Sequence, residues 1–224
     1  MFIGMGMPIP DLANLPGTSR PGSGGGATPL GTISNQYSML FDGTDQYISV
    51  DPVDLGVDGS MTLWFKPATG AGTDYALIGE NSSGFDYLIR RQSGSFYVAI
   101  GSNYLSFTGI SGNILTNSWN FLGVSKTAGN VDVYLYNSTN PNGVNTSVTN
   151  AAVSSLNLKF DRIGARTNST GILPFDGHID EVAGFNYALT EAQIKEIYDA
   201  TDVAVTADLS TMATPPVAWY RMGD

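Results

Sequence analysis

The stretch SWNFLGVSKTAGNVDVYLY, residues 118–136, carries the pattern that decides the fold. In its second half the apolar residues Val131, Val133 and Leu135 alternate with an aspartate and two tyrosines, at positions 132, 134 and 136. Alternation with a period of two indicates a β-strand whose two faces meet different surroundings. The pair Gly129-Asn130 lies just before this strand, and such a pair is typical of a tight turn. The stretch therefore predicts two neighbouring strands joined by a turn.

Similar short runs, rich in β-branched and aromatic residues, occupy most of the chain outward from this hairpin. They include YSMLF, QYISV, SMTLWFK, DYALIGE, FDYLIRRQ, SFYVAI and YLSF upstream, and LKFDRIG downstream. Turn-forming pairs separate many of them, namely Asp42-Gly43, Asp58-Gly59, Ser83-Gly84, Ser93-Gly94 and Asn142-Gly143. Many strands at short spacing, with no helix between them, favour an all-β sandwich or barrel.

One short helix is predicted after the strands, in the stretch LTEAQIKEIYDA. Thr190 is a favourable N-cap residue, and Gln193 three positions later completes a capping box. Leu189 before the cap and Ile194 at the fourth helical position form a hydrophobic staple. Because the apolar residues of the stretch share one face, we expect a short helix packed on a sheet.

The composition limits the classes of partner. The chain has 224 residues, of which 42% are hydrophobic, and a formal net charge of −10. An acidic chain is repelled by nucleic acid and by anionic lipid, so we expect neither as a partner. No segment approaches the ~20 apolar residues of a membrane span, and we expect no membrane insertion. The chain contains no cysteine, which excludes disulfides and thiolate chemistry.

Three zones divide the chain. Residues 1–34 are rich in proline and glycine and cannot build a core, which predicts an arm with a flexible hinge at GSGGG. Residues 35–200 hold the predicted strands and helix and form the folded domain. Residues 201–224 form a C-terminal extension, in which PPVAWYRMGD predicts a terminal strand. The opening MFIGMGMPIP lacks the basic residue and long apolar run of a signal peptide.

Four segments, in order, resemble the laminin-G-like branch of the concanavalin A-like lectin/glucanase superfamily. They are SMLFDGTDQYISV, SMTLWFKP, SWNFLGVSKTAGNVDVYLY and FDGHIDEVAGFNYALTEAQIKEIYDA, and the resemblance covers roughly Asn35 to Ala200. It implies an antiparallel jelly-roll β-sandwich with one short C-terminal helix, here preceded by the extended N-terminal arm. PPVAWYRMGD resembles the opening strand of another such repeat, so we expect either a strand that adds to a sheet or a sequence that continues further.

The stretch FDGHIDEVAGF, residues 175–185, raises the question of catalysis because it holds the chain's only histidine among three acids. Glycoside hydrolysis needs two carboxyl groups about 5–9 Å apart. The glucanase branch of the superfamily carries Glu-x-Asp-x-x-Glu on one strand, a spacing that this sequence lacks. Asp180 and Glu181 are adjacent, and adjacent strand residues point to opposite faces. We expect no catalytic residues and no enzyme, with Asp180 tying down a loop and His178 partly exposed.

Four aspartates are candidate ligands for calcium, which binds six to eight oxygen atoms such as those of rim-loop carboxylates and carbonyls. They are Asp42, Asp45, Asp176 and Asp180. The alternative is that they form turns, because no loop has the acid spacing of an EF-hand. We expect no other cofactor.

Four tyrosines are candidates for stacking on sugar rings, because an aromatic face is a good platform for C–H surfaces. They are Tyr75, Tyr87, Tyr97 and Tyr104. The alternative is that these tyrosines are ordinary sheet and core residues. Stacking would allow the domain to bind host glycans.

The N-terminal arm is similar to the leading segments of structural proteins in tailed-phage virions. This resemblance implies a virion surface structural protein, either a capsid decoration or an appendage subunit, made in the host cytoplasm. Two alternatives remain: a stand-alone carbohydrate-binding module of a bacterial surface protein, and a glycoside hydrolase.

The arm also carries apolar residues that would be costly to leave in water. The predicted assembly contacts are Phe2, Ile3, Ile9, Leu12 and Leu15. Prolines between them forbid a regular helix and interrupt any central strand. We therefore expect the arm to order only against another chain, in a homo-oligomer of virion subunits.

Overall fold

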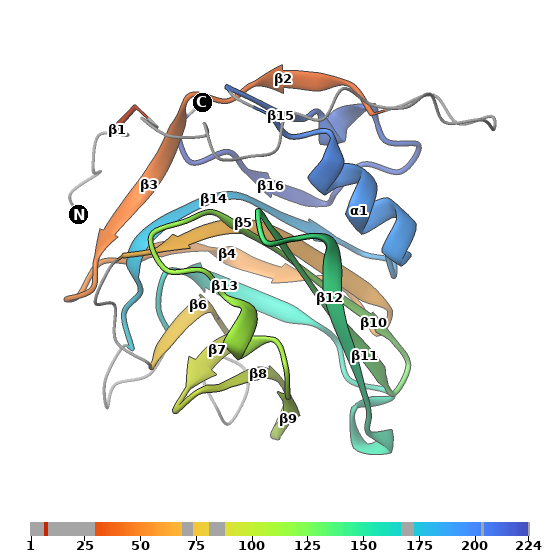
Figure 1. Cartoon of the computed structure of the whole chain (residues 1–224). Helices are drawn as coiled ribbons and strands as arrows, with labels where there is room; N and C mark the ends of the chain where they lie inside the picture. Colours follow the sequence, from red (N-terminus) through yellow and green to blue (C-terminus); the bar gives the residue numbers. More distant parts are fainter. Residues whose placement is uncertain are drawn as a thin grey trace.

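Two antiparallel sheets are stacked face to face in the structure, a computed structural model (Figure 1). It describes residues 7–8, 30–68, 74–80, 88–166, 173–202 and 204–223. This arrangement confirms the predicted all-β jelly-roll sandwich with one short helix.

The larger sheet has eight strands. Its order is β1 (Met7–Pro8), β3 (Tyr37–Asp42), β14 (Asp176–Phe185), β5 (Gly59–Pro67), β10 (Asn120–Thr127), β11 (Asn130–Asn137) and β12 (Asn140–Thr149), with β16 (Ala218–Tyr220) paired to β14. The smaller sheet has six strands, in the order β4 (Ile48–Asp54), β13 (Lys159–Ile163), β6 (Tyr75–Gly79), β7 (Ile89–Gln92), β8 (Ser95–Ile100) and β9 (Asn103–Phe107).

Short elements complete the fold. A separate ladder joins β15 (Val205–Ala207) to β2 (Thr32–Ser34), and the α-helix is α1 (Glu191–Asp199). Three 3₁₀ turns lie at η1 (Ser111–Asn113), η2 (Ala151–Val153) and η3 (Leu209–Thr211).

The stretch of residues 118–136 forms the hairpin β10–β11, as predicted from its alternation and turn pair. Val131, Val133 and Leu135 are fully buried in the core between the two sheets. Tyr134 and Tyr136, on the opposite face, are also buried, because a second apolar cluster covers that face. The two faces of the strand therefore do meet different surroundings.

Helix α1 supplies much of this second cluster, lying over the outer face of the larger sheet (Figure 1). It begins at the predicted capping box, in which Thr190 Oγ1 accepts from Gln193 N at 3.3 Å and Thr190 N donates to Gln193 Oε1 at 2.9 Å. The helix approaches β10 closely because Gly123 has no side chain. A Cβ atom at that position would lie 2.6 Å from Cγ2 of Ile194.

Strand β14 contains a bulge that changes which way its residues face. Ile179 and Val182 both belong to the core between the sheets, although regular alternation would put them on opposite faces. The register against β5 shifts between Asp180 and Ala183, and Glu181 has a left-handed backbone with φ of 51°. The sequence-based expectation that Asp180 and Glu181 lie on opposite faces is therefore wrong, because the extra residue of a bulge breaks the alternation.

Candidate functional site

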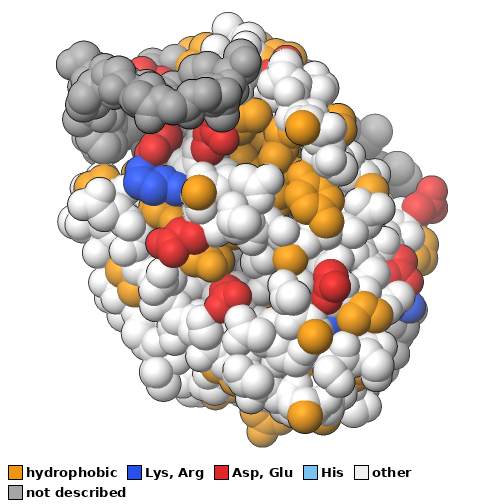
Figure 2. Space-filling model, turned by 90° about the vertical axis from the view of Figure 1, so that its right-hand side faces the viewer, with side chains coloured by type: hydrophobic (Ala, Val, Ile, Leu, Met, Phe, Trp, Pro, Cys, Tyr) orange, Lys and Arg blue, Asp and Glu red, His pale blue; other side chains and the backbone are white. Residues whose placement is uncertain are grey.

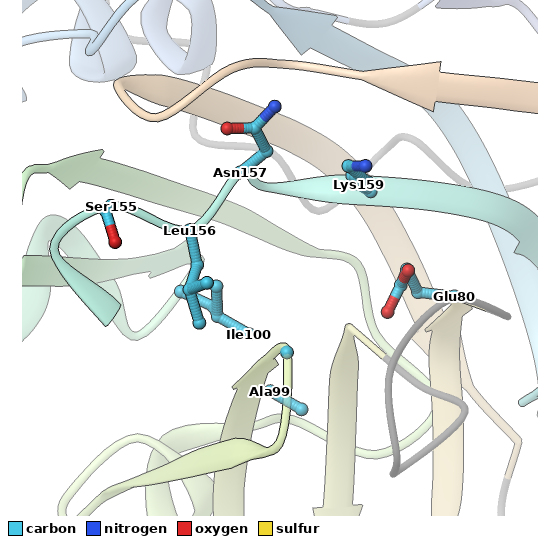
Figure 3. A pocket seen from close by; sticks show the side chains of 8 residues that line it. Glu80, Ala99, Ile100, Ser155, Leu156, Asn157 and Lys159 are labelled. Carbon is cyan, nitrogen blue, oxygen red and sulfur yellow. The ribbon is translucent and has the colours of Figure 1, made fainter. Parts of the chain in front are cut away.

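The candidate site is a hollow of about 330 Å³ at the end of strands β6 and β8. Figure 3 shows open space with Glu80 on one side and Leu156 and Ile100 on the other. The complete lining is Glu80, Ala99, Ile100, Gly101, Ser155, Leu156, Asn157 and Lys159. Glu80 directly follows β6, residues 99–101 lie at the end of β8, and residues 155–159 lead into β13. The fold therefore gathers the lining from three separate stretches of the chain.

Strand alternation explains the direction of Lys159. Its neighbours Leu158 and Phe160 are buried in the core between the sheets. Because successive strand residues point to opposite faces, Lys159 lies on the outer face of the smaller sheet. Its Nζ atom is 3.3 Å from Oδ2 of Asp54, and both side chains are about half exposed.

Asp54 supports this edge of the hollow. Its Oδ1 atom accepts from Nδ2 of Asn157 at 2.9 Å and from the backbone N–H of Gly56 at 2.9 Å. Burial raises the pKa of Asp54, but the hydrogen bonds from Asn157 and Gly56 together with Lys159 outweigh it and lower the pKa below its usual value. The carboxylate therefore stays ionised and fixes Asn157 and Lys159 in place.

Glu80 supplies the acid that borders the hollow. Its side chain is only 6% exposed, and it follows the last residue of β6. Nearby, Ala76 and Ala99 form a small cluster on the outer face with Tyr97 and Leu173 packed against it. Ala76 and Ala99 are 0% and 1% exposed, so protein covers this part of the outer face beside the hollow.

Two of the four candidate tyrosines lie beside this face. Tyr104 is paired across the strands with Ala99, a lining residue, and is 56% exposed. Its ring centroid is 5.7 Å from that of Tyr97, with the rings nearly perpendicular. Tyr75 is 2% exposed in the core, packed edge-on against Phe175. This burial corrects its assignment as a stacking residue, since protein covers its ring.

Tyr87 lies outside the described residues, as do the five arm residues predicted as assembly contacts, Phe2, Ile3, Ile9, Leu12 and Leu15. Elsewhere in the arm, Met7 and Pro8 pair with β3 of the same chain. The expectation that the arm orders only against another chain is therefore too strict, because the edge of β3 offers backbone partners within the molecule.

The four candidate calcium ligands do not converge. Asp42 and Asp176 lie opposite each other on β3 and β14, and Oδ1 of Asp42 accepts from the backbone N–H of Thr44 at 2.9 Å. Asp45 is exposed in the turn that follows. Asp180 lies four residues farther along β14, is 2% exposed and accepts from Nδ2 of Asn35 at 3.0 Å. Among the described residues, no group of three or more His, Cys, Asp or Glu could hold a metal ion.

The acids of the 175–185 stretch bind structural partners. Asp180 holds Asn35, which lies just before β3. Oε2 of Glu181 accepts from Nε1 of Trp219 at 2.6 Å, and Oε1 lies 3.5 Å from Nε of Arg221. These contacts tie the segments before β3 and around β16 to the bulge of β14.

His178 is half-buried on the outer face of the larger sheet. Its Nδ1 atom lies 2.9 Å from Oγ of Ser38, and its ring meets that of Trp119 at 6.1 Å between centroids. Burial lowers the pKa of His178 below its usual value, and the nearby Lys66 lowers it further. The imidazole is therefore mainly neutral at pH 7 and makes a structural hydrogen bond.

The sequence alone did not single out the lining residues of the hollow. For Lys159, the alternation in LKFDRIG was a usable signal, because two apolar neighbours on a strand imply an outward side chain. For Glu80 and Asn157 no such signal existed. Their roles depend on which strand ends the fold brings together.

Comparisons with known proteins agree with this architecture. Residues 42–195 match the model of a laminin-G family described as the concanavalin A-like lectin/glucanases superfamily, which is more than half of the chain. The chain therefore belongs to this superfamily. No curated protein sequence matches the chain.

Solved structures with low sequence identity share the fold. A candidate carbohydrate-binding protein from Bacteroides ovatus has a TM-score of 0.58 at 17% identity, covering 87% of this chain and 52% of its own. The enzymatically active domain of tailspike protein 2 from bacteriophage CBA120 has a TM-score of 0.58 at 13% identity, covering 88% of this chain and 32% of its own. This chain thus spans about half or less of either protein. No helix among the described residues is long and apolar enough to cross a membrane.

Proposed function

We propose that the chain is a carbohydrate-binding domain and that a sugar occupies the hollow bordered by Glu80, Lys159 and Leu156. The observation that carries this proposal is the lining, in which a carboxylate, an amide and an amine surround an apolar wall. Binding sites for small molecules are typically concave and largely apolar, with a few placed polar groups. Membership of a lectin/glucanase superfamily supports the same class of ligand.

The lining suits the two kinds of surface that a sugar presents. The Glu80 carboxylate accepts hydrogen bonds from hydroxyl groups, and hydrogen bonds to charged groups are stronger than neutral ones. The apolar side chain of Leu156, which is only partly buried, contacts the C–H surface of the ring. Tyr104, exposed beside Ala99, offers a ring on which a neighbouring sugar unit stacks.

Charge around the hollow favours a neutral or amino sugar over an acidic one. Two carboxylates, Glu80 and Asp54, stand near one amine, Lys159, and that amine is already paired with Asp54. The net charge of −10 adds a further repulsion against anionic ligands. Sialylated and uronic-acid glycans are therefore expected to bind more weakly than neutral or amino-sugar glycans.

The test is isothermal titration calorimetry against neutral, amino-sugar and acidic oligosaccharides, preceded by a glycan array. Glu80→Gln is expected to weaken binding about tenfold or more, because a hydrogen bond to a charged group is lost. Ser154→Ala is the matched control, since Ser154 is exposed beside the lining residues without belonging to them. The proposal fails if the wild type binds no glycan, or if both variants bind equally well.

The proposed setting is a virion surface, with the chain as a capsid decoration or appendage subunit. In this setting the arm binds neighbouring subunits of a homo-oligomer, and the domain faces host glycans. The resemblance of the arm to leading segments of phage virion proteins supports this setting. Mass spectrometry of purified particles tests it: the chain should be present in stoichiometric amounts with capsid or tail proteins, and its absence contradicts the setting.

We propose binding without turnover. The adjacent acids Asp180 and Glu181 hold Asn35, Trp219 and Arg221, which supports a structural role for both. Incubation of a bound polysaccharide with the protein should release no fragments detectable by chromatography. Cleavage that Glu80→Gln or Glu181→Gln abolishes would instead identify an enzyme.

A further inference from the structure

We infer that the glycan site extends from the hollow across the outer face of the smaller sheet to Tyr47, and that its ligand is an oligosaccharide of several units. The inference rests on the proposed carbohydrate function and identifies a second subsite within it. The starting observation is the side chain of Tyr47, which lies just before β4 and is 44% exposed. An open aromatic ring is a good platform for the C–H surface of a sugar.

Arg162 holds the ring of Tyr47 in place. Its Cζ atom lies 3.9 Å from the centroid of the ring, which is a cation–π contact. The guanidinium is anchored in turn, because its Nη1 atom donates to the backbone carbonyl of Arg166 at 3.0 Å. A ring that is already fixed loses little conformational entropy when a ligand stacks on it. Tyr47 therefore combines an exposed aromatic surface with a preorganised position.

Tyr47 lies on the same face of the smaller sheet as the hollow. Ile163 is fully buried in the core between the sheets, so its neighbour Arg162 points to the outer face. The ring of Tyr47 is stacked on Arg162 and lies on that face too, and the next residue, Ile48, packs against the core. Lys159, which lines the hollow, also lies on the outer face.

Strand pairing connects Tyr47 to the hollow. Glu80 borders the hollow and directly follows Gly79, which pairs with Arg162 across β6 and β13. Arg162 also pairs with Ser49 on β4, two residues after Tyr47. From β6 to β4 is two strand spacings, or about 10 Å. A single sugar ring is shorter than this distance, so a ligand that contacts both places contains several linked units.

The size of the hollow supports an extended ligand. Its volume of about 330 Å³ is near the lower end of the range of about 300–1,000 Å³ that is typical of small-molecule sites. The hollow therefore holds only part of an oligosaccharide. Tyr104 on β9 and Tyr47 beside β4 mark the two edges of the smaller sheet, and the lining strands lie between them. A longer glycan meets an exposed ring on either side of the hollow.

The test is isothermal titration calorimetry of the full chain with short and long members of two glycan series. The neutral series is glucose and cellotetraose, and the amino-sugar series is glucosamine and the chitosan tetrasaccharide. Tyr47→Ala removes the ring, whereas Tyr47→Phe retains it and controls for a folding defect. Tyr37→Ala is the matched control, because Tyr37 is 36% exposed on β3 of the other sheet.

In at least one series the wild type is expected to bind the tetrasaccharide more tightly than the monosaccharide. Tyr47→Ala should weaken binding of that tetrasaccharide about tenfold, while Tyr47→Phe and Tyr37→Ala bind it like the wild type. Equal affinity for both lengths, or an unchanged affinity of Tyr47→Ala for the tetrasaccharide, overturns the inference and leaves the carbohydrate function intact. Absence of binding in both series also overturns the inference, and the proposed function then stands only if the wild type binds another glycan on the array.

Discussion

At the scale of single residues, Glu181 shows how a buried charge can fasten two segments. The residue sits in the bulge of β14 with a left-handed backbone and is 4% exposed. Its carboxylate accepts from Trp219 and pairs with Arg221, both at the end of the chain. A buried carboxylate needs such partners, because leaving either charge alone in a poorly hydrated site is costly.

Removing this charge should therefore destabilise the fold. Glu181→Gln keeps the size of the side chain but loses the ion pair with Arg221, and we expect a loss of about 1–3 kcal/mol in unfolding free energy. Urea denaturation measures it. Asp45→Asn, at an exposed acid in the turn after β3, is the control and should cost less than about 0.5 kcal/mol. Equal stability of the two variants would show that the ion pair contributes nothing.

His178 predicts a pH dependence that can be assigned without ambiguity, because it is the chain's only histidine. Burial lowers the pKa of His178 in the folded state below its ordinary value of 6.5. Below that pH the unfolded chain binds more protons than the folded one, so stability falls as the pH decreases. Above it both states are neutral at this residue and the contribution is constant.

Melting temperatures between about pH 7 and pH 5 test this, a window above the usual pKa range of carboxyl groups. The wild type should lose stability toward pH 5, and His178→Gln should lose less over the same interval. Parallel curves for the two proteins would contradict the assignment.

At the scale of elements, the hairpin β10–β11 and helix α1 were predictable because local patterns specify them. Alternation around Val133 and the capping box of Thr190 act over a few neighbouring residues. The bulge of β14 was not predictable, since it arises where β14 changes its partner from β3 to β16. That change of partner depends on tertiary contacts, and the sequence around residues 180 and 181 has no local pattern that predicts it.

The contact between α1 and β10 predicts the effect of one added methyl group. Gly123→Ala would place Cβ 2.6 Å from Cγ2 of Ile194, which forces the helix away from the sheet. Overpacking of this kind typically costs about 1–3 kcal/mol, and we expect a loss in that range by chemical denaturation. The double variant Gly123→Ala with Ile194→Ala should lose less than the sum of the two single losses. Strict additivity would mean that the two positions do not touch in solution.

At the scale of the whole molecule, the candidate hollow exists only because distant segments meet. Glu80, Ile100 and Leu156 come from three parts of the chain that lie next to each other after folding. Composition and periodicity describe each strand separately and contain no information about which strand ends converge. The sequence therefore predicted the class of fold and, through its resemblance, a class of ligand, while the lining residues required the structure. Figure 2 adds that acidic side chains are scattered over a largely uncharged surface on the face that it shows.

The arm gives the final prediction at this scale. Of residues 2–26, the structure describes Met7 and Pro8, which pair with β3 in a two-residue ladder. Deleting residues 2–26 should therefore change the unfolding free energy by no more than about 1 kcal/mol, because one short ladder contributes little. The same deletion should abolish self-assembly, since in the proposed setting the arm binds the neighbouring subunits. Light scattering coupled to size-exclusion chromatography measures the oligomeric state, and thermal melting measures stability. A truncated chain that still assembles would show that another surface holds the copies together, and one that unfolds would show that the arm belongs to the core of its own domain.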